Sequence, residues 1–186
     1  MPFTFSHPAL ILPFGKLSKR WVSFTALFMG AISPDFEYFI RMKILGEFSH
    51  TIGGLFYFCI PVGLLLTFIF HNLIRDPLID NLPKILKSRL ARFKGFNWSR
   101  HFRQYWPVVM VSLLIGAASH IFWDSFTYPG MFFVEMMPAL KNTVPVMGLE
   151  IPKYYILQHL STIVGGLALL WVLWRLPRDN AVSADV

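Results

Sequence analysis

Three long apolar runs divide the chain, and each is long enough to cross a bilayer as a helix. They are Gly53–Phe70, Pro107–Trp123 and Ile156–Trp174. An α-helix of ~18 residues spans about 27 Å, close to the hydrocarbon thickness of a membrane. Pro61 lies in the middle of the first run, where a proline kinks a spanning helix without preventing it. The pattern therefore predicts three membrane-spanning helices.

A fourth apolar run, Trp21–Ile32, is shorter and stops before the turn residues Ser33-Pro34-Asp35. It is short for a span and fits a re-entrant or buried helix equally well. The basic residues near the start of the chain follow the first apolar stretch instead of preceding it, so we expect no cleavable signal peptide. The predicted fold is an all-α integral membrane helical bundle, one domain over residues 1–175 with a short polar tail at 176–186.

Composition supports the membrane prediction. Hydrophobic residues make up 55% of the chain and charged residues only 15%, whereas soluble domains carry about 45–50% apolar and about 25% charged residues. The single cysteine, Cys59, excludes an intrachain disulfide and a metal site built from several cysteines.

The net charge of +7 is concentrated in one loop. Residues 71–106 hold eight Lys or Arg against two Asp, which accounts for +6 of the total. The positive-inside rule therefore places this loop and the C-terminus in the cytoplasm, and the connection 125–155 outside. We expect the loop to meet membrane lipid headgroups and not nucleic acid, because it has no motif for reading a nucleic-acid groove.

Four ionisable residues fall at the predicted external ends of the spans: His50, His120, Asp124 and His159. His120 and Asp124 are four apart, so on a helix their side chains share a face. That pair suits either a divalent metal ion or a structural hydrogen bond. His159 precedes several small residues, and it suits an interhelical hydrogen bond as well as a metal.

Two further candidates lie near the start of the chain. Asp35 follows Ser-Pro and is typical of a turn or cap, but it joins the external group if Trp21–Ile32 rises to that side. His7 precedes a proline and, taken alone, is typical of a surface turn. Glu37 ranks below Asp35. The chain has no GxSxG, P-loop, dinucleotide-binding or HExxH motif, so serine hydrolases, nucleotide-binding proteins and zincins are poorly supported.

Five segments together resemble a known family. They are MPFTFSHPALILP, GAISPDFEYF, FSHTIGG, ASHIFWDSFTYPG and YYILQHLSTIVGG. In order and spacing they resemble the bacterial membrane-protein family called domain of unknown function 4184, from Met1 to about Trp174. The family has no established activity, so this resemblance implies a class of protein and no reaction.

The same histidines and aspartates also resemble, more distantly, inner-membrane metal-dependent hydrolases related to the zinc-dependent phospholipase C and single-strand nuclease superfamily, which is all-helical. That resemblance implies a divalent metal, with zinc as a candidate. The metal-site residues it implies are His7, Asp35, His50, His120 and Asp124, with His159 as a further candidate. The chain has Tyr128 where those relatives often have histidine, which puts one ligand or proton carrier in doubt.

The resemblance conflicts with one part of the predicted topology. If Trp21–Ile32 crosses the membrane, His7 lies on the wrong side of the site. If it is re-entrant or packs inside the bundle, His7 and Asp35 can both face outward, but Lys16 and its basic neighbours then lie against the positive-inside rule.

The expected function is a metal-dependent hydrolase acting on a phosphoester or lipid-like substrate at the external face of a bacterial inner membrane. The alternatives are a non-catalytic membrane protein, with its His and Asp groups in a structural network, and a small transporter.

Overall fold

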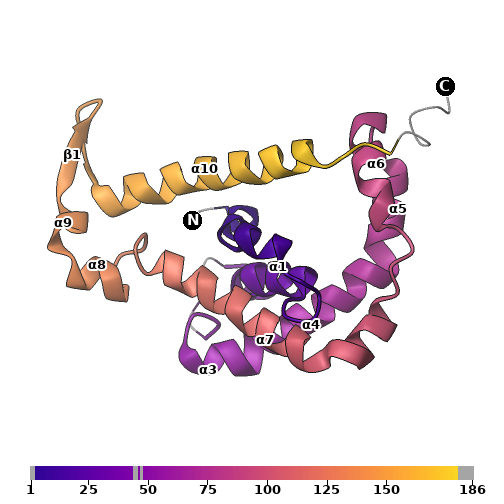
Figure 1. Ribbon diagram of the computed structural model, residues 1–186. Coiled ribbons are helices and arrows are strands. Elements are labelled where there is room, and N and C mark those ends of the chain that lie inside the picture. The colour runs from indigo at the N-terminus through magenta and orange to yellow at the C-terminus, as the bar shows by residue number, and fades with distance from the viewer. Residues whose placement is uncertain (1–2, 44–45, 47, 180–186) are drawn as a thin grey trace.

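The computed structural model describes residues 3–43, 46 and 48–179, and it is a helical bundle (Figure 1). Three helices are long and apolar enough to cross a membrane: Ile52–Asn81, Trp98–Asp124 and Lys153–Arg175. They contain the three predicted apolar runs, so the predicted fold class is confirmed. Most of the predicted polar tail, residues 180–186, lies outside the described residues.

The first long helix is a composite of α-helical and wider π-helical turns. In order these are α3 (Ile52–Gly54), the π segment η3 (Leu55–Cys59), α4 (Ile60–Ile69), the π segment η4 (Phe70–Ile74) and α5 (Arg75–Asn81). Pro61 follows the first π segment and Pro77 follows the second. A proline ring collides with a carbonyl of the preceding α-helical turn, and a wider turn relieves that collision. The predicted disturbance at Pro61 is therefore absorbed within a continuous helix.

The second long helix, α7 (Trp98–Asp124), begins within the basic segment 71–106. It comes after α6 (Lys84–Leu90) and the short 3-10 helix η5 (Ala91–Phe93). The side chain of Asn97 caps α7 by accepting a hydrogen bond from the backbone N–H of Arg100 at 2.8 Å. Tyr105, two residues before Pro107, departs from helical geometry with φ −128° and ψ 27°, so α7 bends there.

The N-terminal segment forms a hairpin inside the bundle. Its first arm is the 3-10 helix η1 (Thr4–Lys16), and its returning arm is α1 (Phe24–Ile32). The 3-10 turn η2 (Ser33–Asp35) and the helix α2 (Phe36–Arg41) follow α1. At about 2 Å per residue, the 13 residues of η1 extend about 26 Å. The hydroxyl of Thr4 meets the carboxylate of Asp35 at 2.5 Å, so both arms reach the same end of the bundle.

The hairpin agrees with the buried arrangement expected for Trp21–Ile32, because α1 packs inside the bundle with six of its nine residues buried. The Nζ of Lys19 lies 5.4 Å from the ring centre of Phe96, which belongs to the basic segment. The tip of the hairpin therefore lies at the end of the bundle that carries residues 71–106, which we call the basic end. His7 and Asp35 lie at the opposite end, because η1 runs through the bundle itself. The conflict with the positive-inside rule arose from treating residues 4–16 as a segment that stays on one side.

Close helix packing holds α1 against α7. A Cβ atom on Gly30 would lie 2.2 Å from the backbone oxygen of Leu113, and one on Gly116 would lie 2.2 Å from that of Leu27. Only glycine permits this approach. The fully buried Leu113 also belongs to the main hydrophobic cluster, so the returning arm of the hairpin is fixed in the centre of the bundle.

A small lobe that the sequence did not predict lies between α7 and the last helix. It contains α8 (Phe132–Met136), α9 (Pro138–Lys141) and an antiparallel hairpin of β1 (Thr143–Val146) with β2 (Leu149–Pro152). Met147 and Gly148 form its turn, both with positive φ, as a type I′ turn requires.

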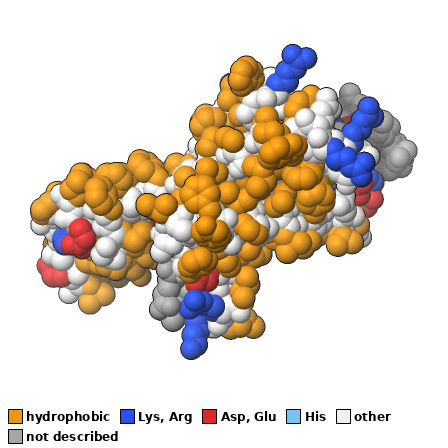
Figure 2. Space-filling view, turned by 90° about the horizontal axis from the view of Figure 1, so that it is seen from below, with side chains coloured by type: hydrophobic (Ala, Val, Ile, Leu, Met, Phe, Trp, Pro, Cys, Tyr) orange, Lys and Arg blue, Asp and Glu red, His pale blue; other side chains and the backbone are white. Residues whose placement is uncertain are grey.

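The third long helix, α10 (Lys153–Arg175), packs through its small residues on η1. A Cβ on Gly165 would lie 2.9 Å from the backbone oxygen of Ser6, whose hydroxyl donates to the carbonyl of Thr162 at 3.0 Å. Figure 2 shows a face of the molecule covered mainly by hydrophobic side chains, with Lys and Arg at its margins, as expected for a surface that meets lipid.

Candidate metal centre

Four ionisable side chains converge at the end of the bundle opposite the basic end, which we call the site end. They are Asp35 at the end of η2, His50 in the turn before α3, and His120 and Asp124 at the end of α7. Each offers one ligand atom, and the four atoms lie within 4.8 Å of one another. Two imidazoles and two carboxylates are a donor set that zinc and other divalent transition metals accept. The group could therefore hold a metal ion.

The imidazole of His120 lies between the two carboxylates. Its Nε2 is 3.3 Å from Asp35 Oδ1 and 3.2 Å from Asp124 Oδ2. The Nε2 of His50 is 3.8 Å from each of the same two oxygens. Ligand atoms around a tetrahedral zinc ion, with bonds of ~2.0–2.1 Å, are about 3.3 Å apart. The His120 contacts already have this spacing, whereas His50 is about 0.5 Å too distant.

The second ring nitrogen of each histidine has a partner outside the centre. His120 Nδ1 donates to the carbonyl oxygen of Ala31 at 2.7 Å, which leaves the lone pair on Nε2. His50 Nδ1 is 2.9 Å from the hydroxyl of Ser49. Both Nε2 atoms are buried, and within the described part of the chain neither makes a hydrogen bond of acceptable geometry. Buried polar atoms are rarely left without a partner, so this arrangement favours a bound cation over a finished hydrogen-bond network.

Each carboxylate uses its outer oxygen for a protein contact. Asp35 Oδ2 accepts a hydrogen bond from the hydroxyl of Thr4, and Asp124 Oδ1 accepts one from His7 Nε2 at 3.0 Å. The inner oxygens remain directed at the two histidines. Contacts of this kind orient metal-binding carboxylates.

The other two candidate histidines have different positions. His7 is fully buried, and its ring stacks on that of His120 with centroids 3.6 Å apart, so it borders the four converging groups through Asp124 and His120. His159 is on the exposed side of α10, with its ring 4.6 Å from that of Tyr155. The structure does not bring His159 into the group.

Three further residues at the site end are not among the metal ligands proposed from the sequence. Tyr38 stacks on His50, with ring centroids 5.6 Å apart, and Tyr128 hydrogen-bonds the side chain of Gln158. Both phenols are close enough to Asp35 and Asp124 that these carboxylates help to raise their pKa values, although burial is the larger cause. The third residue, Glu37, is buried and binds the backbone beside His50. A carboxylate two residues from Asp35 was the only sequence signal for it.

Two of the proposed ligands, His50 and Asp35, have pKa shifts in the direction that metal binding requires. Burial, reinforced by the neighbouring His120, lowers the pKa of His50 below 6.5, and the nearby carboxylates oppose this only in part. Burial would raise the pKa of Asp35, but its contacts with His120 and Thr4 outweigh that effect and lower it below 3.8. At neutral pH His50 is therefore a neutral donor and Asp35 an anion, as metal binding demands.

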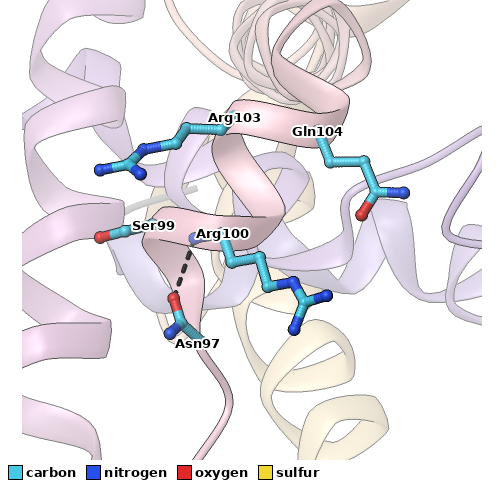
Figure 3. Close-up of a pocket in the computed structure, with 5 residues that line it drawn as sticks. All are labelled: Asn97, Ser99, Arg100, Arg103 and Gln104. Carbon is cyan, nitrogen blue, oxygen red and sulfur yellow. Dashed lines mark hydrogen bonds between the residues drawn. The ribbon is translucent and has the colours of Figure 1, made fainter.

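A pocket of about 540 Å³ lies far from this centre, at the start of α7. Figure 3 shows that its side chains extend from both sides of one helix, with Arg103 on one side and Arg100 and Gln104 on the other. They do not converge on one point, and the cap position of the helix is already occupied by Asn97. The pocket has no arrangement that resembles a catalytic site.

Comparison with known proteins gives one match. A family model described as Domain of unknown function (DUF4184) matches residues 1–185. No curated protein and no solved structure matches the chain. The distant resemblance to metal-dependent hydrolases therefore stays a prediction.

Proposed function

Because the chain belongs to the DUF4184 family, whose description assigns no function, we propose a function from the site itself: a membrane-embedded, metal-dependent hydrolase. Its substrate would be a phosphoester or another ester with a lipid-like body, bound at the external face of the membrane. Asp35, His50, His120 and Asp124 would hold the ion.

One observation carries this proposal. Two buried Nε2 atoms, from His50 and His120, lack hydrogen bonds and lie 3.2–3.8 Å from the same two carboxylate oxygens. A divalent cation among these four atoms would satisfy both nitrogens and balance the two carboxylate charges.

The chemistry of such a site is hydrolytic. A divalent ion held by these four residues, with a fifth coordination position open to water, would supply a bound water with a pKa near ~7 and would polarise an ester or phosphoester oxygen. Asp124 keeps its orientation through His7, and Asp35 through Thr4.

The surroundings of the site favour an amphipathic substrate. Large apolar side chains near the His50 turn are exposed: Phe39, Ile40, Met42, Phe48 and Ile52. His50 is also the least buried of the four ligands, with 10% of its side chain exposed against 0–5% for the others. A substrate approaching past His50 would leave its apolar part among these side chains, at the depth of the lipid headgroups.

The two rival functions fit less well. A structural network would give each buried imidazole nitrogen a well-formed hydrogen bond, whereas the Nε2 atoms of His50 and His120 have only the two carboxylate oxygens at 3.2–3.8 Å, without that geometry. A transporter needs a path from the site to the basic end, but Gly30 and Gly116 bring the backbones of α1 and α7 together between the two ends. That close contact favours a site that is closed toward the basic end.

The test begins with elemental analysis of the detergent-purified protein and of His120→Ala and Asp124→Ala, with His159→Ala as the matched control. About one equivalent of divalent metal in the wild type and in His159→Ala, and little in the two site variants, is the expected result. Equal, near-zero metal in all four would overturn the metal centre. Lipid-like phosphodiester, phosphomonoester and carboxylic ester substrates would then be offered to the loaded protein. Metal binding without turnover of any of them would contradict the hydrolase function alone.

A further inference from the structure

His50 is the ligand that the fold positions least directly. Asp35, His120 and Asp124 belong to helical elements packed in the bundle, whereas His50 lies in the turn between α2 and α3. It is also the ligand whose Nε2 is about 0.5 Å beyond the spacing suited to a tetrahedral ion. The contacts that hold this turn therefore decide whether the fourth ligand reaches the ion.

Glu37 binds the backbone of that turn directly. Its carboxylate accepts hydrogen bonds from the backbone N–H groups of Ser49, at 2.7 Å, and of Phe48, at 3.2 Å. Only 3% of the residue is exposed. The Nε of Arg41 also donates to it, at 2.9 Å, but Arg41 is 43% exposed. Hydrogen bonds to a buried carboxylate are among the stronger ones in proteins, so the two peptide contacts fix the residues immediately before His50.

The ring of His50 is confined from two directions. Tyr38, the neighbour of Glu37, stacks on it at an interplanar angle of 14°. A Cβ atom on Gly46 would lie 2.5 Å from His50 Nδ1 and 2.8 Å from Tyr38 Cε1, so the bare backbone of Gly46 lies against both rings. The hydroxyl of Ser49 contacts the same Nδ1. The imidazole therefore has little freedom except along the direction of its Nε2.

We propose that Glu37 is a positioning residue for the metal centre: it anchors the peptide groups of residues 48 and 49 and thereby presents His50 Nε2 to the ion. This inference rests on the proposed metal centre and adds a residue that does not itself touch the ion. Without the Glu37 carboxylate, two buried peptide N–H groups lose their acceptor, and the turn must shift to find another. Since His50 is already slightly distant, a small outward shift removes the fourth ligand.

The experiment measures Zn²⁺ affinity by competition with a chelator, using the full chain in detergent. Glu37→Ala is expected to weaken affinity 10–100-fold, the usual effect of losing a residue that orients a ligand. Glu37→Gln should lose less, because Oε2 of Glu37 accepts from both peptide N–H groups and the amide oxygen can take its place. Arg41→Ala, which removes an exposed partner of Glu37, and Glu135→Gln, which removes a remote exposed carboxylate, should each stay within about twofold of the wild type.

Two further measurements separate positioning from general destabilisation. The absorption spectrum of the Co²⁺ form of Glu37→Ala should resemble that of His50→Ala, because both lose the same ligand. The double variant Glu37→Ala/His50→Ala should bind Zn²⁺ no more weakly than His50→Ala alone. If Glu37→Ala does not fold, Glu37→Gln takes its place in both measurements, because its neutral amide oxygen is a weaker acceptor for the same peptide N–H groups.

The outcomes are distinct. A wild-type protein that binds no metal would overturn the proposed function and this inference with it. A wild type that binds metal while Glu37→Ala binds equally well would overturn the inference alone. Additive losses in the double variant would also overturn it, because they would show that Glu37 acts independently of His50.

Discussion

His7 and Asp124 are 117 positions apart in the sequence, and their side chains meet with 3.0 Å between Nε2 and Oδ1. The other oxygen of the same carboxylate, Oδ2, faces His120 at 3.2 Å. Asp124 therefore joins a histidine outside the proposed centre to one inside it. This relationship requires η1 to begin at the site end, and so it links the unusual N-terminal hairpin to the site.

Removing the His7 contact should weaken metal binding without abolishing it. His7→Ala leaves all four proposed ligands in place but removes the hydrogen bond to the outer oxygen of Asp124, so Zn²⁺ affinity should fall about 10–100-fold with one ion still bound at saturation. Asp124→Ala should lose the ion altogether. Titration with Zn²⁺ in detergent measures both, and a wild-type affinity in His7→Ala would show that this contact does not orient the ligand.

The contact between α1 and α7 should be intolerant of even a methyl group. Gly30→Ala would place a Cβ 2.2 Å from the backbone oxygen of Leu113, and the helices must separate by overpacking that costs about 1–3 kcal/mol. His120 is held by the carbonyl of Ala31, so metal affinity should fall as well. Gly53→Ala is the matched control, because its nearest neighbour would be Thr51 Oγ1 at 3.8 Å. Thermal unfolding in detergent compares the two, and equal stability of both variants would contradict the packing described.

The N-terminal hairpin predicts an unusual labelling pattern. Phe3 and Lys19 are both exposed and are only 16 positions apart, yet the structure places them at the site end and the basic end respectively. In intact cells, Phe3→Cys should react with a membrane-impermeant thiol reagent, as should Met147→Cys at the fully exposed hairpin turn. Lys19→Cys and Lys94→Cys should react only after permeabilisation. The native Cys59 is fully buried and should contribute little.

The same experiment tests the orientation expected from the positive-inside rule. The reversed pattern, with Lys94→Cys labelled in intact cells, would place the site in the cytoplasm. Labelling of Phe3→Cys and Lys19→Cys from the same side would contradict the hairpin itself.

The three spans could be predicted because hydropathy reports directly on lipid exposure. The pairing of His120 with Asp124 could also be predicted, because four-residue spacing fixes a shared face on any helix. The path of residues 4–16 could not. Pro8 and Pro13 lie inside η1 and remove backbone donors, so the segment has the pattern of a loop, and only packing against α1, α7 and α10 makes it a long 3-10 helix.

The positions of His159 and Glu37 also could not be predicted from the sequence. His159 lies near the start of α10, as the sequence predicts. Small residues such as Ser161 and Gly165 face η1, however, and this packing sets the rotation of α10 so that His159 is exposed. The sequence places Glu37 below Asp35 as a candidate ligand, because a helix directs the two side chains away from each other. Its partners are the peptide groups of residues 48 and 49, which no side-chain pattern encodes.

Two histidines and two aspartates are expected to bind one divalent ion at the site end. X-ray absorption at the zinc edge of the Zn²⁺-loaded protein measures this, because the first coordination shell reports ligand types and distances. The expected shell consists of nitrogen and oxygen at ~2.0–2.1 Å with the scattering of two imidazoles, reduced to one in His50→Ala and unchanged in His159→Ala. A protein that binds no zinc, a shell containing sulfur, or an imidazole signal that His50→Ala leaves unchanged would contradict it.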